Sequence, residues 1–372
     1  MIFRVQSCFK RLFRKPSPHD LILISDTSIQ ACWRMYWAVR RAVHRLTRGV
    51  ITQQRALVMA PCRAVGGAVG PLVDGSVTVE QAVSLWAQHF QQHCVSEPLL
   101  SSQYIIAHVL GQKTLACIER SRLRDRLTEQ QRASVWELCS KRLARMPVQY
   151  VIEEWDFRDI TLKMRPPVFI PRPETEELVT LVLEDLQAEL KDRTRPVLRC
   201  LEVGCGTGAI SLSLLHSLPQ LKAIALDKSQ EAVCLAKENA SRLGLEDRLE
   251  VHHLDIMKDE YLIVRDCGAF DVLVSNPPYL FTQDMESLQA EVVRFEDHAA
   301  LDGGSDGLSV ISQILALAPK LLTDKGRVYL EVDPRHPPLL KHLADQGMLG
   351  LQYLETHCDF TNRPRFCVLQ RR

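Results

Sequence analysis

Four consecutive residues in the C-terminal half, Asn276, Pro277, Pro278 and Tyr279, have side chains and backbone suited to chemistry on a nitrogen. They follow an apolar run, residues 270–275, that is typical of a buried strand. A double proline cannot continue a central strand, because proline lacks the N–H and has a fixed φ, so the chain must turn there. In an open α/β sheet, ligands bind at this carboxyl edge of the strands.

The turn offers a side-chain amide, a carbonyl without a ladder partner and an aromatic face. Together they suit a planar NH2 group, which would donate its two hydrogens to the Asn276 side-chain oxygen and the Pro277 carbonyl. Tyr279 would stack on the plane of that group, and the nitrogen would face an electrophile. An ordinary Asn-Pro turn is the alternative that these residues alone leave open.

A glycine-rich loop joins an earlier predicted strand, residues 197–203, to a predicted helix, residues 209–215. Its members are Gly204, Cys205, Gly206, Thr207 and Gly208. Alternate glycines let the backbone approach a ligand closely, and the start of the helix offers free N–H groups. The next predicted strand, residues 223–226, ends at Asp227, whose carboxylate can accept both hydroxyls of a ribose. The loop and Asp227 indicate a nucleoside-containing cofactor, although the glycine spacing alone also fits a dinucleotide.

A third predicted strand, residues 251–255, ends in Asp255, which is followed by Ile256. This acid would lie at the height of an adenine amino group, although an exposed acid at a strand end is also common. The order of glycine loop, ribose acid, adenine acid and Asn-Pro-Pro-Tyr turn resembles the S-adenosylmethionine-dependent methyltransferases that modify an exocyclic or amide nitrogen.

Further blocks narrow this resemblance, and they occupy residues 147–150, 170–176, 294–297, 300–304 and 306–308. Over about residues 77–372 the chain resembles the release factor glutamine methyltransferase family. The resemblance implies methyl transfer from S-adenosylmethionine to the glutamine amide in the Gly-Gly-Gln loop of a peptide chain release factor. Catalysis would rest on Asn276, Pro277 and Tyr279, and the whole turn, Pro278 included, would bind the substrate.

The residues expected to bind the cofactor are Gly204, Cys205, Gly206, Thr207, Gly208, Asp227, Asp255, Ile256 and Asn276. Because a sulfonium methyl is already activated, we expect no general base, and catalysis would rest on positioning and electrostatics. Residues 174–176 are expected to close over the cofactor, and Phe169 to pack near it.

The chain departs from the family pattern at two places. Glu153 and Glu154 stand where the family usually has a glycine, which puts a tight turn in doubt. Glu296 and Asp297 stand where it usually has Glu-Pro, which puts the shape of a loop in doubt.

Two other functions remain open from the sequence. Methylation of adenine N6 in DNA or RNA uses the same Asn-Pro-Pro-Tyr chemistry, and a scaffold could bind the cofactor without catalysis. A nucleic acid substrate would favour a basic face, but residues 74–372 carry 34 Lys or Arg against 43 Asp or Glu. We therefore expect a protein substrate and no nucleic acid substrate. We also expect a monomer.

The N-terminal residues 1–73 carry 12 Lys or Arg and only two acids, Asp20 and Asp26. A basic, acid-poor start resembles an organelle transit peptide, which predicts the mitochondrial matrix as the destination. A disordered basic tail or an unusual start site is the alternative. The sequence has no run of 18 apolar residues, so we expect no membrane span. The 12 cysteines show no C-x-x-C pair and the histidines no metal-ligand spacing, so we expect no metal.

Four segments are expected. After the basic extension 1–73, residues 77–145 read as a helical domain for substrate recognition or as a purely structural appendage. Residues 146–165 read as a hairpin linker. Residues 166–372 alternate strands and helices, which predicts a Rossmann-like methyltransferase fold with a mostly parallel sheet and an antiparallel C-terminal strand.

Overall fold

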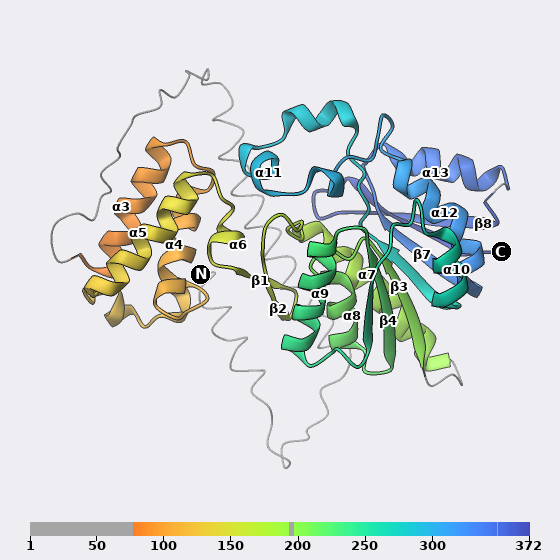
Figure 1. Ribbon diagram of the computed structural model, residues 1–372, viewed down its shortest axis with the longest axis horizontal. Coiled ribbons are helices and arrows are strands. Elements are labelled where there is room, and N and C mark those ends of the chain that lie inside the picture. Colours follow the sequence, from red (N-terminus) through yellow and green to blue (C-terminus); the bar gives the residue numbers. More distant parts are fainter. Residues whose placement is uncertain (1–76, 193–196, 348) are drawn as a thin grey trace, which may run out of the picture.

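The computed structural model describes residues 77–192, 197–347 and 349–372. The basic extension, with its predicted transit role, lies outside the described residues. Within them the chain forms a helical unit followed by a unit built on a large sheet (Figure 1). No helix in the described part of the chain is long and apolar enough to cross a membrane.

Three helices make up the helical unit, α3 (Val79–Gln92), α4 (Pro98–Val109) and α5 (Glu129–Leu143). Short 3-10 turns at Leu115–Cys117 and Arg120–Arg124 join α4 to α5. Both α3 and α5 begin with a capping box, in which a threonine and the glutamine three residues on exchange side-chain and backbone hydrogen bonds. The apolar faces of the helices enclose a core of their own around Trp86 and Phe90.

The connection to the sheet begins with a helical turn, α6 (Val148–Val151), where the sequence reads as part of a hairpin. The predicted hairpin follows as the antiparallel pair β1 (Glu154–Phe157) and β2 (Ile160–Lys163). Glu153 precedes β1 with a φ of +58°, the left-handed region that favours glycine. The turn that the missing glycine put in doubt is therefore formed by a glutamate.

The second unit contains one sheet of seven strands. These strands are β3 (Leu198–Val203), β4 (Leu221–Asp227), β5 (Leu249–His253), β6 (Phe270–Ser275), β7 (Leu322–Glu331), β8 (Leu351–Cys358) and β9 (Pro364–Arg371). Their order across the sheet is β5-β4-β3-β6-β7-β9-β8. Strands β3 to β7 pair in parallel, whereas β9 is antiparallel to both β7 and β8. This topology confirms the predicted fold class.

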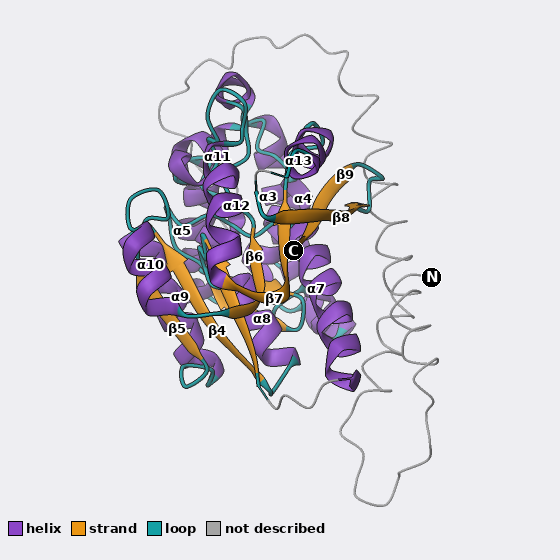
Figure 2. Cartoon of the chain, turned by 90° about the vertical axis from the view of Figure 1, so that its right-hand side faces the viewer, coloured by secondary structure: helices purple, strands orange, loops and turns teal. Residues whose placement is uncertain are grey.

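Helices cover both faces of the sheet (Figure 2). One face packs against α7 (Pro173–Asp192), α8 (Ala209–Ser217) and α9 (Gln230–Leu243). The other packs against α10 (Glu260–Cys267), α12 (Ser309–Leu321) and α13 (His336–Asp345). Alternate strand residues face opposite layers, as Cys200 and Leu201 of β3 illustrate. Because both faces are covered at the centre of the sheet, β3 and β6 are buried along nearly their whole length.

The strand order reverses at β3, since the chain runs from β3 to β4 and β5 on one side and then returns to place β6 on the other. Such a reversal leaves a crevice beyond the carboxyl ends of the strands, where ligands bind in open α/β sheets. The long connection after β6 contains Thr282–Ser287, α11 (Ala290–Phe295) and His298–Ala300. It arches between the helical unit and the sheet above this edge (Figure 1).

Candidate active site

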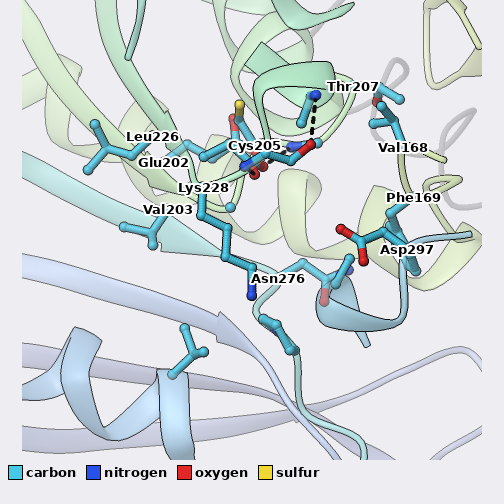
Figure 3. A pocket seen from close by; sticks show the side chains of 18 of the residues that line it. Val168, Phe169, Glu202, Val203, Cys205, Thr207, Leu226, Lys228, Asn276 and Asp297 are labelled. Carbon is cyan, nitrogen blue, oxygen red and sulfur yellow. Dashed lines mark hydrogen bonds between the residues drawn. The ribbon is translucent and has the colours of Figure 1, made fainter. Parts of the chain in front are cut away.

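A cavity opens at the carboxyl ends of β3, β4, β5 and β6, where the strand order reverses (Figure 3). The predicted cofactor residues that line it are Gly204, Cys205, Gly206, Thr207, Asp227, Asp255, Ile256 and Asn276. Gly208 does not line it and instead caps α8 with a φ of +81°. The structure thus brings together residues from four strand ends, and their roles in binding stay predictions.

Asp227 joins the glycine loop to the end of β4. One of its carboxylate oxygens accepts the Gly206 N–H at 2.9 Å, and the other accepts the Ser229 N–H at 2.9 Å. Burial raises the pKa of this carboxyl group, while the two backbone donors act in the opposite direction. Each oxygen keeps a lone pair for a further donor, so a ribose diol can be accepted without moving the side chain.

Glu202, on β3 just before the glycine loop, is a cavity residue that the sequence analysis missed. Its carboxylate is fully buried and accepts the Ser211 backbone N–H at 3.0 Å and the Ser211 hydroxyl. Burial raises the pKa of Glu202 to about 8, against the lowering effect of these two bonds. The single acid in a mostly apolar strand was the available signal, because a buried acid needs dedicated partners.

Asp255 lies on the cavity wall beyond β5 and organises its own turn. It accepts the Met257 N–H at 2.9 Å and pairs with Lys258 at 3.3 Å. The next residue, Ile256, is buried and presents an apolar surface to the cavity. The predicted contact of Asp255 with an adenine amino group stays a prediction.

The Asn-Pro-Pro-Tyr turn closes the β6 side of the cavity. Asn276 and Pro278 line it, whereas Pro277 and Tyr279 lie beside the lining. The Asn276 Nδ2 group donates to the Thr175 hydroxyl at 3.0 Å, which leaves the side-chain oxygen without a donor among the described residues. The Tyr279 hydroxyl turns away to donate to Glu331 at 3.1 Å. The predicted stacking of Tyr279 on a substrate amide stays a prediction.

Thr175 lies in the first turn of α7 and connects that helix to the turn. Its hydroxyl donates to the buried Glu331 carboxylate at 2.8 Å while accepting from Asn276. Thr175 also lines the cavity, as do Phe169 and Pro171 just before the helix. Thr175 and Phe169 thus belong to the cavity wall, and the closure of residues 174–176 over the cofactor and the packing of Phe169 near it stay predictions.

The second departure from the family pattern also lies at the cavity. Glu296 is buried and accepts both the Arg172 guanidinium, at 2.7 and 2.8 Å, and the Ile170 N–H at 3.2 Å. Asp297 lines the cavity, and its N–H donates to the Pro167 carbonyl at 2.9 Å. A proline at this position could not make that bond, so the loop is held to residue 167 by a contact that aspartate permits.

Two glycines let the following segment pack directly on the Asn-Pro-Pro-Tyr turn. A Cβ on Gly303 would come within 2.7 Å of the Pro278 carbonyl oxygen, and one on Gly307 within 2.5 Å of the Tyr279 carbonyl oxygen. The Leu280 N–H also donates to the Leu301 carbonyl at 3.0 Å. The block around residues 300–308 therefore supports the turn from behind. Among the described residues, no cluster of three or more His, Cys, Asp or Glu could hold a metal ion.

Comparison with protein families gives two matches along the chain. Residues 81–152, which span most of the helical unit, match the PrmC N-terminal domain. Residues 179–304, which carry the glycine loop and the Asn-Pro-Pro-Tyr turn, match the Methyltransferase small domain.

Curated relatives cover most of the chain. It is 48% identical over 305 residues to the Homo sapiens protein named MTRF1L release factor glutamine methyltransferase, covering 81% of this chain and 90% of that protein. It is 35% identical to the release factor glutamine methyltransferase of Deinococcus radiodurans, covering 74% of this chain and 92% of the relative. The Rhodopirellula baltica protein of the same name is 31% identical, and the match covers 80% of this chain and 98% of that protein.

Proposed function

The chain belongs to the release factor glutamine methyltransferase family, and from this premise we propose that it methylates the side-chain nitrogen of a glutamine. The acceptor is the glutamine of the Gly-Gly-Gln loop of a peptide chain release factor, and the donor is S-adenosylmethionine. One observation carries the proposal. The Asn276 amide is anchored through its NH2 group to Thr175, which leaves its oxygen to accept a hydrogen from an incoming amide.

The cavity has the chemistry that S-adenosylmethionine requires. Asp227 suits the ribose hydroxyls, and Ile256 offers an apolar surface to the adenine. A further carboxyl group in the lining, that of Asp297, suits a cofactor that carries positive charge. The bound cofactor supplies a methyl group on a positively charged sulfur.

An amide nitrogen is a poor nucleophile because its lone pair is delocalised, and the residues of the turn can make it more reactive. Asn276 Oδ1 and the Pro277 carbonyl accept the two hydrogens of the glutamine NH2, which favours a pyramidal nitrogen and aims its lone pair along the methyl–sulfur axis. The bound cofactor would supply the methyl carbon to this nitrogen, and its sulfur would keep the electron pair of the carbon–sulfur bond that breaks. The nitrogen then gives up a proton to solvent. Positioning of the reactants and electrostatic stabilisation would accelerate the transfer.

The helical unit is proposed to recognise the release factor. It lies beside the long connection that follows the Asn-Pro-Pro-Tyr turn, and Ser96 and Arg142 contact Glu291 of that connection. A partner bound across both would bring a loop to the cavity mouth. The acidic balance of residues 74–372 suits a partner that binds ribosomal RNA and is itself basic.

We also propose that the chain acts in the mitochondrial matrix as a monomer, with residues 1–73 as the transit segment. The support is the basic, acid-poor composition of that segment. Import assays on the full chain and on residues 74–372 test this, with transfer assays on both. Uptake of the full chain alone, with equal activity in solution, would support the transit role.

The experiment that tests the proposed reaction is a transfer assay with labelled S-adenosylmethionine. Three acceptors are compared: a release factor, the same factor with the glutamine of Gly-Gly-Gln replaced by alanine, and RNA. We expect label only in the first. Label in RNA would favour adenine methylation, and cofactor binding without any transfer would favour a non-catalytic scaffold.

A further inference from the structure

We propose that Glu331 is a positioning residue whose carboxylate determines which end of the Asn276 amide faces the cavity. This inference rests on the proposed function and assigns a role to a residue that does not line the cavity. Glu331 ends β7, next to β6 in the sheet, and its side chain is almost completely buried. It therefore lies directly beneath the turn that receives the substrate.

Both oxygens of the Glu331 carboxylate are used, and both partners belong to the site. Oε2 accepts the Thr175 hydroxyl at 2.8 Å, and Oε1 accepts the Tyr279 hydroxyl at 3.1 Å. Thr175 in turn accepts the Asn276 Nδ2 group at 3.0 Å. One buried acid thus holds the first and last residues of Asn-Pro-Pro-Tyr, one through Thr175 and the other directly.

The polarity of this chain of hydrogen bonds follows from the inventory of donors and acceptors. An ionised carboxylate can only accept, so the single hydroxyl proton of Thr175 is committed to Glu331. The Thr175 oxygen can then only accept from Asn276, which must present its NH2 group to it. The Asn276 oxygen is therefore left to face the substrate, and it is the end of the amide that can accept a hydrogen from glutamine.

Protonation of Glu331 would remove this constraint on the hydrogen bonds. A protonated carboxyl can donate to the Thr175 oxygen, which frees the Thr175 hydroxyl to donate to the Asn276 oxygen. The Asn276 NH2 group would then face the cavity, opposite the NH2 group of the glutamine, where two donors meet without an acceptor. Only an ionised Glu331 therefore fixes the orientation that supports transfer.

The surroundings of Glu331 place this change near neutral pH. Burial raises its pKa to about 7, and the hydroxyls of Thr175 and Tyr279 act in the opposite direction. The charged groups facing it are Arg365 of β9, which favours the ionised form, and Glu174 of α7, which disfavours it. The Arg365 guanidinium also lies over the Tyr279 ring, 5.8 Å from its centre.

The test is the pH dependence of kcat for the full chain and for Glu331→Gln, with S-adenosylmethionine and a release factor as substrates. The wild-type kcat should fall on the acid side with a midpoint near 7, the pKa of Glu331. Because glutamine cannot accept both hydroxyls through two anionic oxygens, Glu331→Gln should lower kcat by roughly 10–100-fold, less than loss of a group in direct contact. The variant should also lose the fall of kcat at low pH, which we call the acid limb of the profile. Its affinity for the cofactor should be retained.

A second pair of variants keeps the inference testable if Glu331→Gln does not fold. Thr175→Val preserves the shape of the side chain but removes the hydroxyl, so it should lose the acid limb, whereas Thr175→Ser should keep it. Glu355→Gln, an acid-to-amide change at an exposed position of β8, should leave the profile as in the wild type. An acid limb that persists in Glu331→Gln or in Thr175→Val overturns the inference.

The two proposals fail in different ways. If the wild-type enzyme methylates no release factor, the proposed function is wrong. If the wild type transfers methyl but Glu331→Gln matches its kcat and pH profile, only the role of Glu331 is wrong. A Glu331→Gln enzyme that loses cofactor binding, rather than kcat, would also contradict a role confined to the acceptor amide.

Discussion

In the proposed function, individual side chains divide the site into a part that holds the cofactor and a part that receives the amide. Asp227 belongs to the first part, and its two oxygens are already oriented by Gly206 and Ser229. Asn276 belongs to the second, and its oxygen is left for the substrate by the bond to Thr175. Substitutions at the two positions should therefore separate binding from transfer.

Asp227→Ala should weaken binding of S-adenosylmethionine. Losing charge-assisted hydroxyl contacts should cost about 1.5–3 kcal/mol of binding free energy. Isothermal titration calorimetry measures this, and Asp227→Asn, which retains one acceptor oxygen, should fall between the alanine variant and the wild type. Unchanged affinity in Asp227→Ala would exclude the ribose contact.

Asn276→Ala should leave cofactor affinity nearly unchanged and slow methyl transfer by roughly 10²–10³-fold, the scale of losing one preorganised polar group. Single-turnover kinetics at saturating cofactor separate the two effects. Asn276→Asp is the matched variant, because it keeps an oxygen but removes the NH2 group that anchors the side chain to Thr175. Transfer at the normal rate by Asn276→Ala would rule out that the Asn276 oxygen accepts a hydrogen from the glutamine amide.

Glu202 should make stability depend on pH. Its pKa is raised from the usual value to about 8 in the folded chain, so on raising the pH the unfolded chain ionises first and the folded state loses relative stability up to about pH 8. Glu202→Gln removes this loss. Compared with wild type, the variant should gain roughly 3–4 kcal/mol of unfolding free energy between about pH 5 and pH 8.5.

Urea unfolding at the two pH values measures this difference, and any constant effect of the substitution cancels from it. Glu250→Gln, an exposed acid on β5, is the control and should show no such gain. A Glu202→Gln variant whose stability follows the wild type at both pH values would show that Glu202 ionises in the folded chain as readily as in solution.

At the scale of elements, the sequence was informative where one strand and its turn form a local unit. The glycine loop, the acid at the end of β4 and the turn after β6 could be predicted because each is fixed by residues within about one element. The start of α7 was not predicted. Pro173 is the first residue of the helix, a position where its missing N–H costs nothing.

The place of Glu331 could not have been predicted by the same means. Its partners Tyr279 and Thr175 lie 52 and 156 residues away in the chain. They meet only because β7 pairs with β6 in one particular register, which places Leu330 opposite Ser275. A hydrophobic pattern indicates that a strand exists and is buried, but not how far it is shifted along its neighbour.

The hairpin between the units offers a test at this scale. Glu153 holds a left-handed conformation that costs a side-chain-bearing residue roughly 1–2 kcal/mol. Glu153→Gly relieves this cost but makes the unfolded chain more flexible, so we expect a net gain of about 0.5–1 kcal/mol in unfolding free energy. Glu154→Gly, one residue on in β1, should instead lower it. Chemical denaturation measures the unfolding free energy of both variants. If Glu153→Gly were less stable than the wild type, the claim that Glu153 is strained would be wrong.

For the whole molecule, the connection that contains α11 links the helical unit to the cofactor cavity. In the first turn of α11, buried Glu291 accepts the Ser96 hydroxyl at 2.9 Å and pairs with Arg142 at 3.2 Å and Arg145 at 3.3 Å. At its end, Glu296 binds Arg172 ahead of α7. Removing one partner of such a buried pair leaves an uncompensated charge, so these contacts fix the connection in one place. This arrangement supports recognition of a protein partner by both units together.

The most direct test of the central claim is to locate the methyl group on the product. A release factor incubated with the enzyme and S-adenosylmethionine is digested and analysed by tandem mass spectrometry. We predict a single methyl group on the side-chain nitrogen of the glutamine in the Gly-Gly-Gln loop. The Asn276→Ala enzyme, given the same reaction time, should leave this glutamine unmethylated. A methyl group on any other residue, or an unmodified factor beside methylated RNA, would contradict the account.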